Sequence, residues 1–430
     1  MMKKPKLAII STYDELCGIA SYTKALVPQL EAHFDITVFD LDQYLFRSES
    51  RKVQALADAE IKKICAALPG FDAVNIQLEH GTLGRTKEKI FSRLERIIKA
   101  APHVCVTFHT ILQSNSFPFG QFFNALKRLN VVRAVDVISA HRKNELLSGG
   151  IYDMLRRHSC SAIVHTRRDM RMLRDLHDIK HVYDHPLAYY SEAEIADVLA
   201  TTRRPDFGRL GALPSDTVVL GCFGFVSKYK GIDVALRALK LLPENYHLAI
   251  FGGLHPQGIQ KNVPLDAYIS DLLGEIAPGK KWLDDSGNDS NSVNLSMTAS
   301  DYERLTTSEH PDDLSRRVHF MGALRDEDFP RAMAVCDVAL LPYMEVGQSS
   351  SGPMSMAIEI GRPIVASRTR AFMQLSKYHP GRVRLFEVGN FLELAQVVRS
   401  VSMDDEEYPA RTYNTTTNAQ IYQRALTKAH

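Results

Sequence analysis

A lysine and a glycine stand together after a predicted strand, at positions 230 and 231 of the segment GFVSKYKG that begins at Gly224. A lysine in a strand-to-helix turn can approach a diphosphate as a point charge. Lys228 lies in the same turn and has the same capacity. The simpler interpretation of any one loop lysine is that it is solvated, so a role for Lys230 needs support from other positions in the chain.

A polar loop before a predicted short helix offers a second place for a phosphate. The loop runs from Gln348 to Gly352 and precedes Pro353, a residue that suits the first helical position. A Ser/Gly loop that leads into a helix points backbone N–H groups outward, with the helix dipole behind them. The pattern predicts a phosphate site at Ser350, Ser351 and Gly352, although an ordinary strand-to-helix turn looks the same.

Other polar residues follow predicted strands in the first half of the chain. Gly18 lies in the loop after the first strand, Glu79 follows the strand 73–78, and His109 follows the strand 104–108. Because ligands bind beyond the carboxyl ends of strands in open α/β sheets, these residues are site candidates. The simpler interpretation of His109 is a hydrogen-bonded histidine that caps a strand. The simpler interpretation of Glu79 is a carboxylate satisfied by a nearby helix N-terminus.

Spacing argues against several other kinds of site. The histidines lack HExxH-type spacing, so we expect no metal centre. Lys230 lacks the upstream glycine of a P-loop, the first strand is not followed by a dinucleotide-binding glycine pattern, and no Gly-x-Ser-x-Gly elbow is present. The six cysteines are scattered singly, which favours reduced thiols over disulfides or a zinc site.

The elements that must position these residues alternate between apolar strands and amphipathic helices from Lys6 onward. Near-continuous apolar strands separated by helices predict parallel sheets with helices on both faces. A chain of 430 residues exceeds one ordinary core. We therefore predict an α/β protein of two doubly wound, Rossmann-like domains that face each other across a cleft.

The predicted domain boundaries follow this alternation. The first domain covers residues 1–195 and the second covers 205–410, with a polar linker at 201–216 between the two strand–helix series. The segment 255–317 breaks the alternation and is predicted to be an insertion. The last helix, within residues 416–430, can pack back on the first domain.

The composition is that of a globular protein. Hydrophobic residues make up 45% and charged residues 24% of the chain, which are ordinary values for soluble proteins. The N-terminal apolar run is too short for a signal peptide, and no stretch approaches the length of a membrane span. We therefore expect a cytoplasmic protein. The formal net charge of +2 argues neither for nor against a polyanionic partner. We expect no nucleic acid among the partners of this protein.

The order and spacing of the motifs resemble the retaining glycosyltransferases of the GT-B fold, family 4, over nearly the whole chain. Residues 17–23 resemble the family's N-terminal glycine loop, and residues 104–110 resemble its strand whose terminal histidine lies near the transferred sugar. Residues 223–233 resemble the diphosphate-binding turn, with Lys230 in the matching position. Residues 337–367 resemble the nucleotide-sugar signature.

Three positions depart from the family pattern. Phe225 stands where the family usually has an arginine, and Gln348 and Met356 stand where it usually has two glutamates. Lys228 can replace the lost positive charge, and Glu359, one turn further along, is a candidate for the ribose contact. These departures leave the donor sugar and the nucleotide base open.

The resemblance implies transfer of a hexose from a GDP- or UDP-sugar to a glycan or lipid-linked saccharide, with retention of configuration, in bacterial surface polysaccharide synthesis. In this hypothesis His109 orients the donor sugar, Lys230 stabilises the leaving phosphate, and Glu79 or His80 positions the acceptor. The predicted donor-binding residues are Gly18, Gly224, Lys228, Lys230, Gln348, Ser350, Ser351 and Gly352. No cofactor or metal is required if lysine and helix dipole supply the positive field.

Two alternatives of other classes stay open. A catalytically inactive glycosyltransferase-like scaffold would account for Phe225, Gln348 and Met356. A nucleotide-sugar epimerase or a glycan phosphorylase would use the same architecture.

Basic residues gather in the first half of the chain, at 127–128 with 133, at 141–143 and at 167–174. Such charge is usually solvated. In relatives it can also hold the enzyme on an anionic membrane that carries a lipid-linked glycan, so a peripheral position on the inner face of the membrane is a further expectation.

Overall fold

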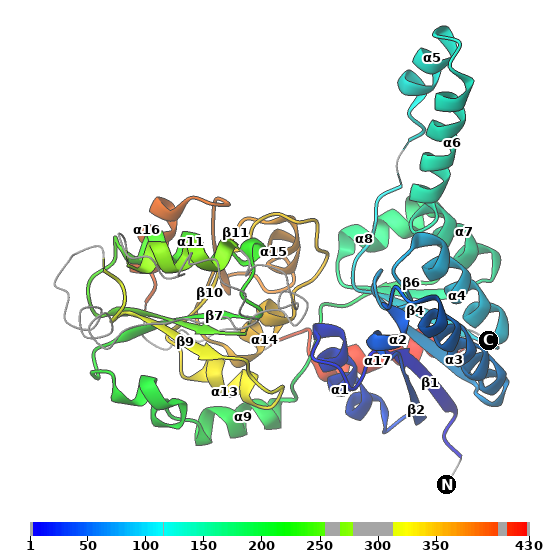
Figure 1. The fold of residues 1–430 in the computed structure, drawn as a ribbon. Coiled ribbons are helices and arrows are strands. Elements are labelled where there is room, and N and C mark those ends of the chain that lie inside the picture. The colour runs from blue at the N-terminus through cyan, green and yellow to red at the C-terminus, as the bar shows by residue number, and fades with distance from the viewer. Residues whose placement is uncertain (1–2, 115, 254–266, 278–312, 403–410, 428–430) are drawn as a thin grey trace. The chain divides into compact units, whose positions relative to one another are not determined.

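The computed structural model in Figure 1 describes residues 3–114, 116–253, 267–277, 313–402 and 411–427. Its contacts group into two compact units. The first contains residues 1–189, 348–352 and 412–430, and the second contains residues 190–347 and 353–411. Most of the predicted insertion 255–317 lies outside the described residues.

The first unit is built on a parallel sheet with the strand order β2-β1-β3-β4-β5-β6. The order reverses beside β1, as in doubly wound sheets. The strands are β1 (Lys6–Ser11), β2 (Asp35–Asp40), β3 (Ala73–Leu78), β4 (Val104–Phe108), β5 (Ser161–Val164) and β6 (Val182–Asp184). Every residue of β3, β4 and β5 is buried, which explains their apolar sequences.

Helices cover both faces of this sheet. They are α1 (Gly18–Leu30), α2 (Gln43–Phe46), α3 (Arg51–Ala67), α4 (Lys87–Ala100), α7 (Gly149–Arg157), α8 (Arg167–Arg171) and α17 (Thr415–Leu426). The C-terminal helix α17 contacts α1 and the strands β3, β4, β5 and β6. One further pair, α5 (Phe119–Lys127) and α6 (Val131–Glu145), forms a hairpin that projects away from the sheet of this unit (Figure 1).

Two polar residues interrupt the apolar pattern of β3, and both are paired. Asn75 donates to the carbonyl of Cys105 at 3.2 Å and to the Thr107 hydroxyl at 3.1 Å. Gln77 donates to Asn75 Oδ1 at 2.6 Å and to the Tyr422 hydroxyl of α17 at 3.2 Å. Buried polar groups are stable when they are paired in this way. The pairs form a polar row that leads towards the carboxyl ends of β3 and β4.

The second unit contains a second parallel sheet, with the order β12-β11-β10-β7-β8-β9. Its strands are β7 (Val218–Phe223), β8 (Tyr246–Phe251), β9 (Val318–Gly322), β10 (Val338–Leu341), β11 (Ile364–Ser367) and β12 (Val383–Phe386). Its helices are α9 (Glu192–Thr201), α10 (Ile232–Leu239), α11 (Ala267–Ile276), α13 (Asp328–Ala334), α14 (Gly352–Ile360), α15 (Arg370–Leu375) and α16 (Phe391–Arg399). The prediction of two doubly wound parallel sheets is confirmed.

The prediction of a polar linker at 201–216 is wrong. Residues 204–212 form two short helical turns of the second unit, joined by a kink at Phe207 and Gly208, and Leu210 is buried. Arg204 donates to the carbonyl of Thr217 at 2.9 Å and pairs with the carboxylate of Asp337. Prolines and glycines in this stretch suggested a loop, but an ion pair with a residue far along the chain holds it against the sheet.

Candidate functional site

The turn after β7 is shaped by two glycines. Gly224 has φ +102°, and a Cβ there would lie 3.0 Å from the ammonium nitrogen of Lys230. Gly231 has φ +64°, and its Cβ would lie 1.9 Å from the carbonyl oxygen of Pro342. Residues Lys228–Lys230 form a single 3₁₀ turn between them. Only glycine allows both the left-handed backbone and the close approach, so the chain must turn here in a way that brings Lys230 inward.

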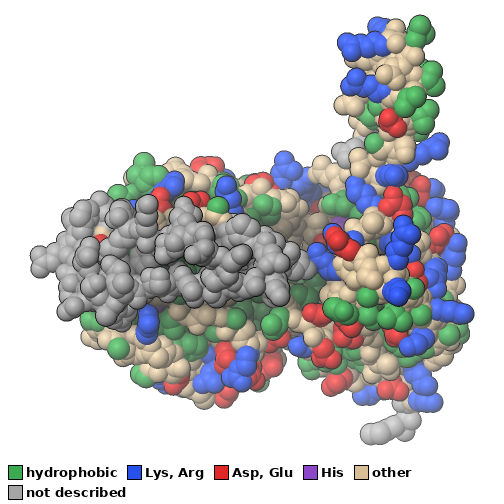
Figure 2. Space-filling view, viewed as in Figure 1, with side chains coloured by type: hydrophobic (Ala, Val, Ile, Leu, Met, Phe, Trp, Pro, Cys, Tyr) green, Lys and Arg blue, Asp and Glu red, His purple; other side chains and the backbone are tan. Residues whose placement is uncertain are grey.

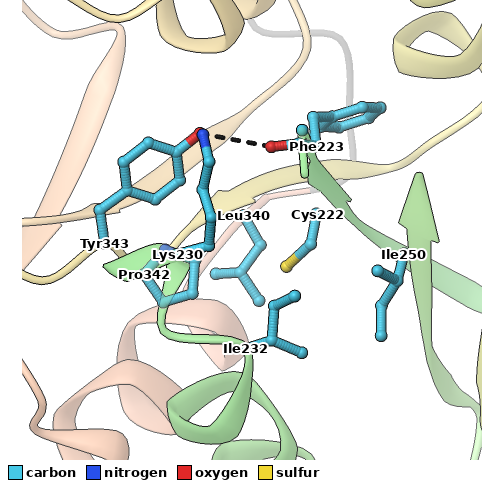
Figure 3. Close-up of a pocket in the computed structure, with 9 residues that line it drawn as sticks. Cys222, Phe223, Lys230, Ile232, Ile250, Leu340, Pro342 and Tyr343 are labelled. Carbon is cyan, nitrogen blue, oxygen red and sulfur yellow. Dashed lines mark hydrogen bonds between the residues drawn. The ribbon is translucent and has the colours of Figure 1, made fainter. Parts of the chain in front are cut away.

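Lys230 is buried, with 8% of its surface exposed. Its Nζ donates to the hydroxyl oxygen of Tyr343 at 2.5 Å and lies 3.9 Å from the centre of that ring. The Tyr343 hydroxyl in turn donates to the carbonyl of Phe223 at 3.3 Å, at the end of β7 (Figure 3). The interpretation of Lys230 as a solvated loop lysine is therefore wrong.

The surroundings of Lys230 are mostly apolar. Figure 3 shows its side chain beside a small pocket lined by Cys222, Ile232, Ile250 and other residues of the second unit. Burial lowers the pKa of Lys230 from 10.5 to about 7. Among the described residues, no carboxylate pairs with this ammonium group. A buried cation without an anion is costly, and a bound anion would remove that cost.

The rest of the turn is more open. Lys228 is exposed, as a solvated lysine would be, and Phe225 is half-buried. The second unit also contains Glu359, the candidate for ribose contact. This carboxylate is buried and lies 3.7 Å from the guanidinium of Arg411, so it already has a cationic neighbour.

The first unit gathers aromatic and imidazole rings at the carboxyl ends of β4 and β5. His109 is buried, and its Nε2 lies 2.8 Å from Gln77 Oε1. Its ring centre lies 5.4 Å from that of Tyr22 and 5.1 Å from that of His165. Burial, with a smaller contribution from His165, lowers the pKa of His109 well below its ordinary value. The ring is therefore neutral at pH 7. With Nε2–H donating to Gln77, Nδ1 carries the lone pair.

His165 is a second neutral imidazole in this cluster. Its Nδ1 lies 2.9 Å from the carbonyl of His185 and donates to it, which leaves Nε2 as an acceptor. That Nε2 is buried and has no hydrogen-bond partner among the described residues. Burial lowers the pKa of His165 to about 4. An unpaired buried acceptor costs about 1 kcal/mol or more, so this atom is suited to a donor from a ligand.

The Ser/Gly loop 348–352 groups with the first unit and lies beside His109. The Ser350 hydroxyl donates to the carbonyl of His109 at 3.3 Å, and the Ser349 hydroxyl oxygen accepts from the amide of Ile111 at 3.2 Å. Ser349 also bonds to the carboxylate of Asp169. Two serine hydroxyls of the loop are thus used to attach it to the chain around His109.

The other residues of the loop are more enclosed than an open phosphate cradle. Gln348 is half-buried, Ser351 is 6% exposed and Gly352 is half-buried. A Cβ at Gly352 would lie 2.8 Å from the hydroxyl of Tyr189. Lys230 and this loop belong to different units, so their convergence on one pyrophosphate remains a prediction.

Glu79 and His80 share one partner at the end of β4. Glu79 Oε2 accepts from the Thr110 hydroxyl at 2.9 Å, and its Oε1 accepts from the amide of His80 at 3.0 Å. Glu79 is therefore satisfied by a threonine and its own neighbour, and a helix N-terminus is not needed. His80 Nε2 lies 3.2 Å from the Thr110 carbonyl, and burial lowers the pKa of His80. Its buried Nδ1 has no partner in the described part of the chain.

Gly18 opens α1, and the Cys17 thiol accepts from the amide of Ala20 at 3.5 Å as the helix cap. A Cβ added to Gly18 would meet nothing within 4 Å. Internal packing therefore does not require this glycine, and the space beside it is available to another group.

Several residues at or next to His109 were not predicted from the sequence. Tyr22, His165 and Gln77 contact His109 itself. Asp169 bonds to Ser349, and Tyr422 accepts from Gln77. His165 could have been predicted from the sequence, because it directly follows β5 as His109 directly follows β4. The two strands are neighbours in the sheet. Gln77 could also have been found from the polar alternation of β3. Tyr422 could not, because it lies more than 300 residues along the chain from its partner Thr107.

Other features concern metals and membranes. Within the described ranges, no group of three or more His, Cys, Asp or Glu side chains is placed to hold a metal ion. In the same residues, no helix combines the length and the hydropathy needed to cross a bilayer.

No protein-family model matches the chain, and no curated protein matches its sequence. Solved structures do match. HepE from Anabaena, in complex with UDP and glucose, has a TM-score of 0.53 at 14% identity, over 98% of this chain and 97% of that chain. Sucrose-phosphate synthase from Thermosynechococcus elongatus has a TM-score of 0.50 at 14% identity, over 98% and 94%.

A third match is a protein from Listeria monocytogenes described as a candidate UDP-N-acetylglucosamine 2-epimerase. It has a TM-score of 0.52 at 14% identity, over 97% of this chain and 94% of that chain. At these identities the likeness concerns the fold. The chain has the GT-B fold of two Rossmann-like units, and this fold carries more than one activity.

Proposed function

We propose that the protein is a glycosyltransferase that takes a hexose from a nucleoside-diphosphate sugar. The observation that carries this proposal is the buried ammonium group of Lys230, which no carboxylate pairs among the described residues. A desolvated cation at the carboxyl end of a parallel strand is a binding site for an anion, and a diphosphate fits both the charge and the position in the fold. The HepE structures with UDP and with UDP-glucose support this choice of ligand.

The difficult step is cleavage of the bond between the anomeric carbon and the diphosphate. Negative charge grows on the leaving phosphate, and a positive group fixed in advance lowers the barrier, with about 3 kcal/mol lost when one good donor is removed. In the proposal Lys230 supplies that charge, the amides around Ser351 and Gly352 assist it, and Lys228 helps from the exposed side of the turn. No divalent metal is needed under this scheme.

The neutral state of His109 supports its proposed role at the donor sugar. With Nε2–H held by Gln77, the lone pair of Nδ1 can accept a hydrogen bond from a sugar hydroxyl. Gly18 leaves room for a close approach of backbone to ligand. Glu79 is proposed to position the acceptor, with Thr110 holding its carboxylate in place. Retention of configuration, with the departing phosphate taking the acceptor's proton, completes the proposed mechanism.

The proposed acceptor is a glycan or a lipid-linked saccharide, reached from the inner face of the membrane in bacterial surface polysaccharide synthesis. Basic side chains of the first unit support the membrane part of this proposal. The acceptor itself rests on the family resemblance of the motifs.

Calorimetric titration with UDP and GDP, followed by turnover assays over a panel of nucleotide sugars, tests the proposal. We expect the wild-type protein to bind one of the two nucleotides, and Lys230→Ala to lose binding and transfer. Lys377→Ala is the matched control, because Lys377 is an exposed lysine of the same unit. Wild-type transfer rates in Lys230→Ala would refute the assignment of the leaving-group cation.

The same assays separate the alternatives. An inactive scaffold would convert no sugar and need not bind either nucleotide. The Listeria match supports testing for an epimerase, which would change the configuration of the sugar without an acceptor. Mass analysis of the products with and without acceptor, together with identification of the sugar's configuration, distinguishes it from a transferase.

A further inference from the structure

The hairpin of α5 and α6 exposes large apolar side chains at its free end. Phe119 is 60% exposed and Phe123 54%, on successive turns of α5. Leu129 in the turn is 88% exposed, and Val131 and Val132 at the start of α6 are 66% and 74% exposed. Leu126 and Val135, in the same two helices, are 41% and 57% exposed. We call these seven residues the hairpin tip.

Two residues of the tip, Phe119 and Phe123, join ring contacts inside the hairpin, and each still keeps more than half of its surface exposed. The residues of α5 and α6 that are buried are small, namely Ala125 and Ala134. Phe117 and Phe122 contact each other with ring centres 5.5 Å apart; Phe119 lies 5.0 Å from Phe117, and Phe123 lies 5.7 Å from Phe122. An apolar surface of this kind, left exposed on a projecting element, marks an interaction site.

Leu129 is the most informative residue of the tip. It has φ +51°, in the left-handed region, at the C-terminal end of α5. Its amide donates to the carbonyl of Leu126 at 2.9 Å, and the amide of Asn130 donates to the carbonyl of Ala125 at 2.9 Å, so the turn is well formed. Glycine usually occupies such a position because it has no Cβ. The turn itself therefore gives no reason for a leucine, whereas an apolar contact outside the hairpin does.

The charges near the tip are mainly basic. Residues 119–135 contain Lys127, Arg128 and Arg133 and no acidic residue, and the exposed Asp136 follows Val135. All three basic residues are exposed. Figure 2 shows hydrophobic and basic side chains together on the projecting hairpin. Apolar side chains surrounded by lysine and arginine are the pattern of elements that lie in the interface of an anionic bilayer.

We propose that the hairpin tip inserts into the headgroup region of an anionic lipid bilayer. The apolar side chains enter the acyl boundary, and Lys127, Arg128 and Arg133 pair with lipid phosphates. The charges argue against a second copy of the chain as the partner, because a two-fold contact through the tip would set these cations against their own copies. This inference deepens the proposed function and rests on it for the lipid-linked acceptor, but its measurement is independent of any sugar transfer.

The first experiment measures sedimentation of the full chain with unilamellar vesicles of phosphatidylglycerol and phosphatidylcholine, and with vesicles of phosphatidylcholine alone. We expect partition onto the anionic vesicles that weakens as salt is raised. Leu129→Gly should weaken it about tenfold, because one leucine no longer leaves water. The same change relaxes the left-handed turn, so the variant should be at least as stable as the wild type. A loss of binding in a variant of that stability cannot come from unfolding. Leu176→Asn, at another exposed leucine of the unit, is the control and should bind as the wild type.

The second experiment tests the charges. The triple variant Lys127→Gln, Arg128→Gln, Arg133→Gln should weaken binding to anionic vesicles by about a hundredfold, given the contribution of each basic residue near such a surface. The matched control removes three exposed lysines of α3 in the same unit, by the changes Lys52→Gln, Lys62→Gln and Lys63→Gln. This control should retain binding.

The outcomes separate this inference from the proposed function. Vesicle binding that is unchanged in both hairpin variants, or absent in the wild type, overturns the membrane proposal. Light scattering that shows a wild-type dimer, dissociated by Leu129→Gly, together with no vesicle binding, would assign the tip to a second copy and also overturn it. Vesicle binding by a protein that binds neither UDP nor GDP would support the hairpin proposal while the proposed function fails.

Discussion

Replacing Lys230 by methionine should stabilise the protein while it abolishes nucleotide binding. Methionine has a similar length and no charge, so it fills the space beside Tyr343 without the desolvation that burial imposes on an ammonium group. A gain in stability from the loss of a buried residue is unusual. It is expected here because Lys230 has no carboxylate partner among the described residues.

The size of the effect depends on pH, and its sign follows from proton linkage. Burial lowers the pKa of Lys230 from 10.5 to about 7, so between these values the unfolded chain holds more protons than the folded one. Stability of the wild type therefore rises with pH across this window. At about 1.4 kcal/mol per pKa unit, the lowered pKa of Lys230 destabilises the folded state by about 5 kcal/mol at pH 6, where the folded lysine is mostly charged, and by about 2 kcal/mol at pH 9, where it is neutral.

Urea unfolding followed by circular dichroism, at pH 6 and at pH 9, measures this difference. We expect the stability advantage of Lys230→Met over wild type to shrink by about 3 kcal/mol between the two pH values. Lys377→Met, at the exposed lysine, should show no such change. Titration of wild type with UDP or GDP at pH 7 should also take up about half a proton per nucleotide, because the bound diphosphate raises the pKa of the lysine.

Parallel pH profiles for wild type and Lys230→Met would refute the reasoning. They would mean that the ammonium group is not desolvated in the folded protein, and the argument for an anion site at this turn would lose its basis.

Three further predictions concern the residues around the two sites. His109→Asn should lower turnover about a hundredfold through misplacement of the donor sugar, while nucleotide affinity measured by calorimetry stays near the wild-type value; unchanged turnover would return His109 to a structural role. Tyr343→Phe removes the hydroxyl that accepts from the Lys230 ammonium group, so the pKa of Lys230 should fall further. As pH is raised, the variant should therefore lose nucleotide affinity at a lower pH than the wild type does. Coincident profiles of affinity against pH would contradict this. Gly231→Ala should lower the free energy of unfolding in urea by about 3 kcal/mol or more, because its Cβ would clash with the Pro342 carbonyl in a left-handed turn. The control is Gly274→Ala in α11, where the added Cβ meets open space. That change should be neutral or raise the free energy of unfolding by up to about 1 kcal/mol.

The alternation of apolar strands and helices was sufficient to predict the architecture. A strand such as β10 is buried on both faces, so its sequence is continuously apolar. The positions of His109 and Lys230 after their strands could also be predicted, because a strand end is a local feature. The error at 201–216 shows the limit of local composition, since Arg204 finds its carboxylate partner at Asp337.

The chemical state of each candidate was decided by tertiary contacts. Lys230 is a desolvated cation because Tyr343, more than a hundred residues away, covers it. His109 is neutral, with a defined tautomer, because Gln77 from the neighbouring strand accepts from Nε2 and the surrounding rings exclude water. The sequence by itself determined which residues stand at the ends of strands. Only the folded chain determined which of them lose their water and what they pair with, because burial and partner choice depend on residues that are distant in sequence and close in space.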